Sequence, residues 1–82
     1  MQQIALCESG KRQFNDDGSV LRGGYNPQDV GIFQINEHYH LQRSKDLGLD
    51  IYTLEGNIGY ALLLYQENGT RDWNWSKSCW GS

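Results

Sequence analysis

Residues 2–10 read QQIALCESG, and this stretch predicts both the first helix and the most unusual side chain of the protein. Ile4, Cys7 and Glu8 stand at i, i+3 and i+4, the spacing of residues on one face of a helix. Gly10 is a typical helix stop. We therefore expect Glu8 at the C-terminal end of a short helix, on the side that faces the core. Loss of hydration there raises the pKa of a carboxyl group.

This placement of Glu8 has a functional and a structural interpretation. A carboxyl group that stays protonated near neutral pH is what general acid catalysis needs. The structural alternative is a buried carboxylate that forms an ion pair, for instance with Arg12 four residues further along the chain, or a helix cap. Position alone leaves both interpretations open.

Composition limits the class of protein. The chain has 82 residues, of which 38% are hydrophobic and 21% charged, and this predicts a single folded domain over residues 1–82. The net charge is −3 and the basic residues are scattered, which argues against nucleic-acid binding. The longest apolar run, residues 61–65, is far shorter than the roughly 18 residues of a membrane-spanning helix.

Two cysteines lie near opposite ends of the chain. A bond between Cys7 and Cys79 closes a loop of about 72 residues, and loop-closure entropy makes this worth roughly 4 kcal/mol. A domain this small buries a limited core and benefits from such a bond. We favour the disulfide, and with it an oxidising compartment. Two separate buried thiols are the alternative.

The rest of the chain predicts a mostly helical α+β fold. Residues 13–28 are polar and rich in turn-forming residues, and the β-like pieces at residues 20–21 and 30–35 fit a small hairpin or a three-stranded patch. Asn36 is expected to cap a second helix that runs to about Leu47. Thr53 is expected to cap the third and clearest helix, which ends at Asn68-Gly69. The tail is expected to fold back as a short turn of helix.

The third helix is expected to bury one apolar face. Its apolar residues at helical spacing are Leu54, Ile58, Ala61, Leu62 and Tyr65.

Asp29 opens the stretch from Val30 to Asn36, which reads as a strand. In an extended chain Asp29 would share one face with Phe33, while Gln34 and Asn36 would share the other. Polar side chains on a strand can hydrogen-bond a polar ligand such as a sugar. A solvated edge strand is the structural alternative.

No metal or other cofactor is expected. His38 and His40 do not have a metal-ligand spacing, and both are expected on the solvated side of a helix. Residues 16–18 read DDG but lack the remaining ligand positions of a calcium loop, so a turn is expected there.

Several short motifs together resemble the lysozyme superfamily, in particular the soluble-lytic-transglycosylase-like domains of bacteria and the catalytic domain of resuscitation-promoting factors. The motifs, in chain order, are Cys7-Glu8-Ser9-Gly10, Gly31-Ile32-Phe33-Gln34-Ile35-Asn36, Asn57-Ile58, Trp73 and Cys79-Trp80. The resemblance covers residues 4–80. It implies a minimal lysozyme-like fold. The later Tyr-Asn-x-Gly motif of larger transglycosylases and the other disulfides of animal lysozymes are absent.

The resemblance also implies a site. Glu8 would be the catalytic acid, with the Cys7–Cys79 bridge holding the end of its helix. Asp29 would match the second carboxylate of animal c-type lysozymes, which begins a similar strand. The residues that would contact glycan are Gln34, Asn36 and Trp73, although a tryptophan near a terminal disulfide can equally belong to the core.

The activity so implied is cleavage of the β-1,4 bond between N-acetylmuramic acid and N-acetylglucosamine in peptidoglycan. Lytic transglycosylases often work with a single Glu and leave 1,6-anhydro ends, so this outcome is an alternative. A non-catalytic glycan-binding domain is another. The expected partner is a peptidoglycan glycan strand, and the expected protein is a monomer that is secreted, periplasmic or associated with the cell wall.

Overall fold

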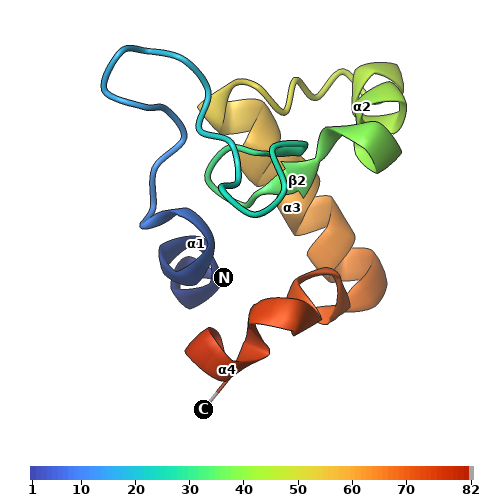
Figure 1. Cartoon of the computed structure of the whole chain (residues 1–82). Coiled ribbons are helices and arrows are strands. Elements are labelled where there is room, and N and C mark those ends of the chain that lie inside the picture. Colours follow the sequence, from blue (N-terminus) through green and yellow to red (C-terminus); the bar gives the residue numbers. More distant parts are fainter. Residues whose placement is uncertain (82) are drawn as a thin grey trace.

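The computed structural model describes residues 1–81 and confirms an α+β fold with more helix than strand (Figure 1). The elements in chain order are α1 (Gln2–Ser9), β1 (Asp29–Val30), β2 (Ile35–Asn36), α2 (Glu37–Asp46), α3 (Leu54–Asn68), the 3-10 helix η1 (Arg71–Ser76) and α4 (Lys77–Trp80).

The ends of the three longer helices are set by local capping, as the sequence predicts. α1 ends at Gly10, which adopts the left-handed conformation with φ of 66°. The Asn36 side chain accepts a hydrogen bond from the Tyr39 N–H (3.2 Å) at the start of α2. The Thr53 hydroxyl accepts one from the Gly56 N–H (3.0 Å) at the start of α3. These caps fix where α1 ends and where α2 and α3 begin.

The predicted continuous strand over residues 30–36 is wrong. β1 and β2 are two residues each and pair antiparallel, with Asp29 opposite Asn36. Between them the chain turns through Gly31 and Gln34, whose φ angles of 79° and 52° are left-handed. The turn reverses the chain, so the predicted alternation of faces along one strand does not apply. Asp29 and Asn36 instead meet across the hairpin.

The predicted third strand is reduced to single bridges. Val20 pairs with Phe14, and Arg22 pairs with Val30 of β1. These bridges place the long segment between α1 and β1 beside the hairpin. Its tip is the predicted turn at residues 16–18, where Gly18 has φ of 88°.

The buried face of α3 matches the predicted one only in part. Ala61 is buried and Ile58 packs against the core, as predicted. Leu62 and Tyr65 are 46% and 45% exposed. The residues of α3 that are buried are Gly56, Asn57, Tyr60, Ala61 and Leu64. Close packing at Gly56 sets this rotation, because a β-carbon there would lie 1.9 Å from the Asp50 carbonyl oxygen. α3 therefore turns Gly56 toward Asp50 and the Asn57 amide toward the hairpin, while Leu62 and Tyr65 are exposed.

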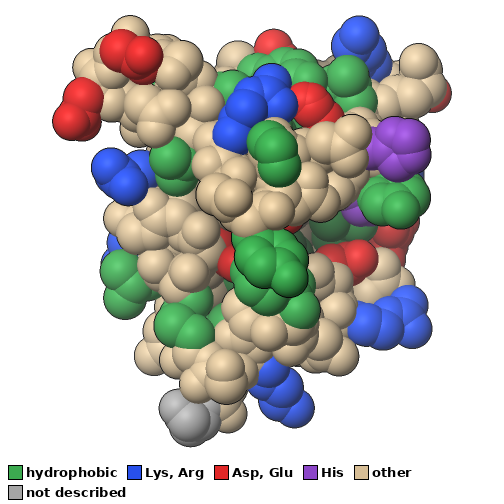
Figure 2. Space-filling model, in the orientation of Figure 1, with side chains coloured by type: hydrophobic (Ala, Val, Ile, Leu, Met, Phe, Trp, Pro, Cys, Tyr) green, Lys and Arg blue, Asp and Glu red, His purple; other side chains and the backbone are tan. Residues whose placement is uncertain are grey.

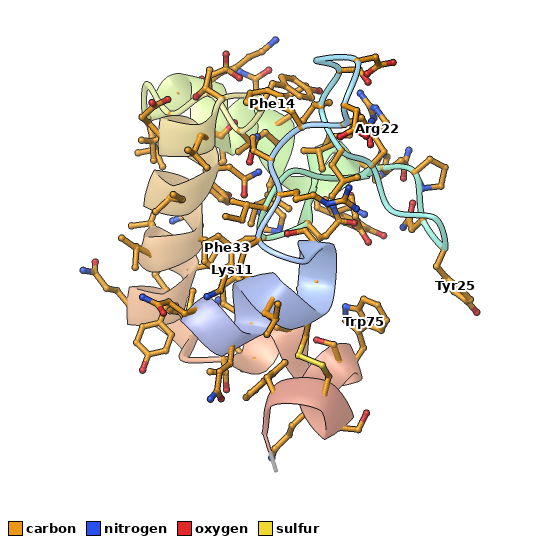
Figure 3. All side chains as sticks on the ribbon, turned by 90° about the vertical axis from the view of Figure 1, so that its left-hand side faces the viewer. Lys11, Phe14, Arg22, Tyr25, Phe33 and Trp75 are labelled. Carbon is orange, nitrogen blue, oxygen red and sulfur yellow. A yellow bond between two sulfur atoms is a disulfide. The ribbon has the colours of Figure 1, made fainter. Side chains whose placement is uncertain are left out.

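The core joins the hairpin, α3 and both ends of the chain. Its buried hydrophobic residues are Ile4, Ala5, Val30, Phe33, Ile35, Ile51, Tyr60, Ala61, Leu64 and Trp73. α1 packs against η1 and α4. The predicted disulfide is confirmed, with the Cys7 and Cys79 α-carbons 6.0 Å apart, and it joins α1 to α4 (Figure 3). Over residues 1–81, no helix has the length and apolar character needed to cross a membrane.

Candidate active site

A cleft of about 280 Å³ lies between the end of α1, the hairpin, α2 and η1. Figure 2 shows acidic side chains in the hollow across the middle of this face, beside hydrophobic ones. The residues that line the cleft are Glu8, Asp29, Gln34, Ile35, Asn36, Tyr39, His40, Leu64, Asp72, Trp73 and Trp75. The fold thus brings together all five residues to which the sequence assigns catalysis or glycan contact.

Glu8 is a half-buried carboxyl group at the end of α1. Burial raises its pKa to about 7, and the negative charge of Asp29 adds to the rise. The nearby Ser76 hydroxyl lowers the pKa of Glu8. This opposing effect is smaller than that of burial, and the same hydroxyl donates to Trp73 O and accepts from Trp80 Nε1. No ion pair joins Glu8 to Arg12 within the described part of the chain. Burial thus favours the protonated form of Glu8 near neutral pH, and no basic side chain within residues 1–81 forms an ion pair with it.

Asp29 faces the same cleft from β1. Burial raises its pKa, while a hydrogen bond from Asn36 lowers it; the Asn36 Nδ2 donates to Asp29 Oδ1 at 3.0 Å. An Asp at this position could instead stabilise the turn at residues 25–28, but in the part of the chain that the structure describes the Asp29 side chain does not. Asn26 does so, since its Oδ1 accepts the Gln28 N–H at 3.0 Å. The Asp29 carboxylate is thus oriented by Asn36 and is not occupied by a turn.

The Ser9 hydroxyl joins the helix that carries Glu8 to the hairpin that carries Asp29. The buried Ser9 Oγ donates a hydrogen bond of 2.7 Å to Ile32 O, in the turn between β1 and β2. This bond ties the end of α1, which carries Glu8, to the hairpin, which carries Asp29. In the sequence Ser9 stands out only as part of the Cys7-Glu8-Ser9-Gly10 motif, and nothing there indicates this contact with the hairpin.

The buried Asn57 side-chain amide of α3 hydrogen-bonds the backbone of the hairpin turn. Its Oδ1 accepts the Phe33 N–H (3.0 Å), and its Nδ2 donates to Val30 O (3.0 Å) and Ile51 O (2.8 Å). Asn57 is fully buried, so these bonds form away from water. The sequence holds a signal for it, because an Asn in the middle of an apolar helix needs buried partners.

A second buried amide, Gln13, completes this support. Its Oε1 accepts the Ile32 N–H at 2.8 Å and its Nε2 donates to Ile51 O at 3.1 Å. Gly31 makes room for both amides, since a β-carbon on Gly31 would lie 2.3 Å from Asn57 Nδ2. Sequence reasoning placed Gln13 in a polar loop and missed it. Together the two amides make the hairpin a rigid support for Asp29.

Gln34 and Asn36 line the cleft, but internal hydrogen bonds already hold them. Gln34 Nε2 donates to Gly31 O at 2.9 Å, and Asn36 caps α2 while it orients Asp29.

The predicted sugar contact by Trp73 needs correction. Trp73 is 2% exposed, and its Nε1 donates to Phe33 O at 3.0 Å, so this ring belongs to the core and forms only the wall of the cleft. Trp75 is 70% exposed and lies at the cleft, as a ring available for stacking on a sugar (Figure 3).

His40 also departs from its predicted solvated position. It is half-buried at the cleft, and its Nδ1 forms a hydrogen bond with the Tyr60 hydroxyl (2.9 Å). Burial lowers the pKa of His40. His38 is exposed, as predicted. Within residues 1–81, no three His, Cys, Asp or Glu side chains gather closely enough to hold a metal ion.

Comparison of the chain with protein-family models, curated proteins and solved structures gave no match.

Proposed function

We propose that this protein cleaves peptidoglycan glycan strands at the β-1,4 bond between N-acetylmuramic acid and N-acetylglucosamine. The observation that carries the proposal is Glu8, a desolvated carboxyl group with a pKa of about 7 that shares a cleft with Asp29. Glycosidases use two carboxyl groups in this way, one protonated and one ionised, in environments that separate their pKa values.

Each carboxyl group has one task in this reaction. Glu8 donates its proton to the glycosidic oxygen as the bond from that oxygen to the anomeric carbon breaks. Asp29, held by Asn36, stabilises the positive charge that develops at the anomeric carbon. Water then supplies the hydroxyl group to that carbon, and its second proton returns to Glu8. The products are two shorter strands, one with a new reducing end.

Other features of the molecule support this proposal. A disulfide persists in oxidising surroundings, which fits action outside the cytoplasm on a cell wall. The exposed Trp75 ring beside the two carboxyl groups provides the apolar surface on which the CH face of a sugar packs.

The test is digestion of purified sacculi followed by mass spectrometry of the released fragments. Glu8→Gln keeps the shape of the side chain and removes its transferable proton, so release should fall by about 10²–10⁴-fold. Glu55→Gln, at an exposed Glu in α3, is the matched control and should act like the parent.

Three outcomes contradict the proposal. Release by Glu8→Gln within about threefold of the parent removes Glu8 as the acid. Products with 1,6-anhydro ends make the protein a lytic transglycosylase. Binding to sacculi without any release makes it a glycan-binding domain.

A further inference from the structure

The cleft continues past Glu8 into a second hollow. This hollow has a volume of about 340 Å³ and shares Glu8 and Gln34 with the first. The residues that line it are Cys7, Glu8, Ser9, Gly10, Arg12, Leu21, Arg22, Gly23, Gly24 and Gln34. A groove with Glu8 near its middle can hold a polymer on both sides of the bond that is cut.

The two arms of the groove differ in charge. The first carries Asp29 and Asp72 besides Glu8, and its one basic side chain is His40, whose pKa is lowered. The second contains no Asp or Glu other than Glu8, and it carries two arginines. An anionic group on the substrate is repelled by the first arm and attracted by the second.

Of the two arginines, Arg12 is the one whose charge has no ion-pair partner among the described residues, although its Nε donates a long hydrogen bond to Ser9 O (3.5 Å). Arg22 Nη1 lies 2.6 Å from Glu37 Oε1 and also donates to Pro27 O, so its charge is compensated. No carboxylate lies within ion-pair distance of Arg12 in residues 1–81. The backbone of Arg12 is fixed by its N–H, which donates to Ser9 Oγ at 3.1 Å.

We propose that Arg12 binds a carboxylate carried by the glycan strand, on a sugar held in the second arm. This inference rests on the proposed function and adds the orientation of the strand to it. A guanidinium group binds a carboxylate through two parallel hydrogen bonds. Gly24 lines the same hollow as Arg12, and no atom lies within 4 Å of the place its β-carbon would take, which leaves space for a substituent larger than a sugar hydroxyl group.

A peptidoglycan strand offers two sources of this carboxylate. One is the peptide stem, whose amino acids carry free carboxyl groups. The other is the lactyl group of muramic acid, which is itself a carboxylate once the stem has been removed. Strands with stems, strands without stems and uncharged chito-oligosaccharides of equal length separate these sources.

The experiment measures affinity in a Glu8→Gln background, so that no ligand is cut. Arg12→Gln is expected to weaken binding of a carboxylate-bearing strand by about fivefold, as an exposed ion pair allows, and to leave the uncharged oligosaccharide unaffected. Loss with intact stems alone assigns the carboxylate to the peptide. Loss with stem-free strands alone assigns it to the lactyl group, whose carboxyl group is an amide while the stem is attached. The difference should shrink as salt concentration rises.

Lys11→Gln is the matched control, because it removes the same charge from the adjacent residue. Lys11 lines a different hollow together with Met1 and Ile32, and Figure 3 shows it on the Phe33 side of α1, away from Trp75. Affinity equal to that of the Glu8→Gln parent is expected.

Two results overturn the inference in distinguishable ways. If Arg12→Gln and Lys11→Gln bind all three ligands alike, or if Arg12→Gln weakens the uncharged oligosaccharide as much as the others, Arg12 does not bind a carboxylate. If the Glu8→Gln protein binds none of the glycans, the proposed function fails first.

Discussion

The two carboxyl groups of the cleft are held in place by different physical means. Asp29 belongs to the hairpin region, residues 29–36, whose turn is held by directional hydrogen bonds from the buried Asn57 and Gln13 amides. Glu8 belongs to the disulfide region, α1 and α4, where a covalent bond joins the two chain ends. The hydrogen bond from Ser9 Oγ to Ile32 O joins the two regions.

A small chain can thus hold the two sides of a cleft by a hydrogen-bond network on one side and a disulfide on the other. A buried hydrogen-bond network acts in the folded state, and every missing partner leaves an unpaired polar group. A disulfide acts mainly on the unfolded chain, whose freedom it restricts. The hairpin region is therefore sensitive to single polar substitutions, and the disulfide region to loss of one bond.

The largest effect is expected from the hairpin region. Asn57→Leu leaves the Phe33 N–H and the Val30 carbonyl group without this partner, while Ile51 O keeps its hydrogen bond from Gln13. Unpaired buried groups cost about 1–3 kcal/mol each, so we expect a loss of about 4 kcal/mol. Urea denaturation followed by circular dichroism measures it. Asn68→Leu, at the end of the same helix, should cost less than about 1 kcal/mol. Equal losses for the two variants would mean that the buried network does not hold the hairpin.

The disulfide region is expected to give a smaller loss. Cys7→Ser together with Cys79→Ser should lower the free energy of unfolding by about 3 kcal/mol, within the usual range for small domains. The same denaturation experiment measures it. Thiol titration of the unfolded, non-reduced parent is the control, and two reactive thiols there would show that the bridge is not formed.

Asp29→Asn tests whether Asp29 contributes to activity or to the stability of the hairpin region. Asn can still accept the hydrogen bond from Asn36, so the melting temperature should stay near that of the parent, while turnover should fall by about 100-fold because the charge is lost. Measurement of kcat, KM and melting temperature checks this. Asp16→Asn, at an exposed turn, is the control. A lower melting temperature with parental turnover would make Asp29 a structural residue and favour chemistry by Glu8 alone.

The smallest effect concerns the cost of burying Glu8. Because its pKa rises from 4.5 to about 7 on folding, the native state binds more protons than the unfolded state between these pH values. The free energy of unfolding therefore falls as pH rises through this window. Glu8→Gln lacks this loss. Because Glu8 is only half-buried, the effect is modest. We expect the Glu8→Gln protein to be more stable than the parent by about 1 kcal/mol at pH 8, or roughly 4–8 °C in melting temperature.

At pH 4 the two proteins should melt together, because Glu8 is then protonated in both states. Melting curves of parent and variant at pH 4, 6 and 8 supply this comparison. A constant difference at all three values would show that Glu8 is ionised in the same way before and after folding.

Local patterns in the sequence determined the helices, their caps and the acid. The spacing of Ile4 and Glu8 with a stop at Gly10, and the capping residues Asn36 and Thr53, act within one or two turns of chain, so a reader of the sequence can find them. The cysteine pair also follows from the size of the chain, since a small domain has much to gain from a long closed loop.

Tertiary structure alone decided the hairpin, the buried face of α3 and the supports of the cleft. A short apolar run fits a strand or a turn equally well, and the turn at Gly31 forms because Asn57, from a helix distant in sequence, supplies its hydrogen-bond partners. The sequence does not distinguish Trp73 from Trp75. In the folded protein Trp73 packs against Phe33 and is buried, whereas Trp75 is exposed. Such choices depend on contacts between distant segments, and those contacts exist only once the chain has folded.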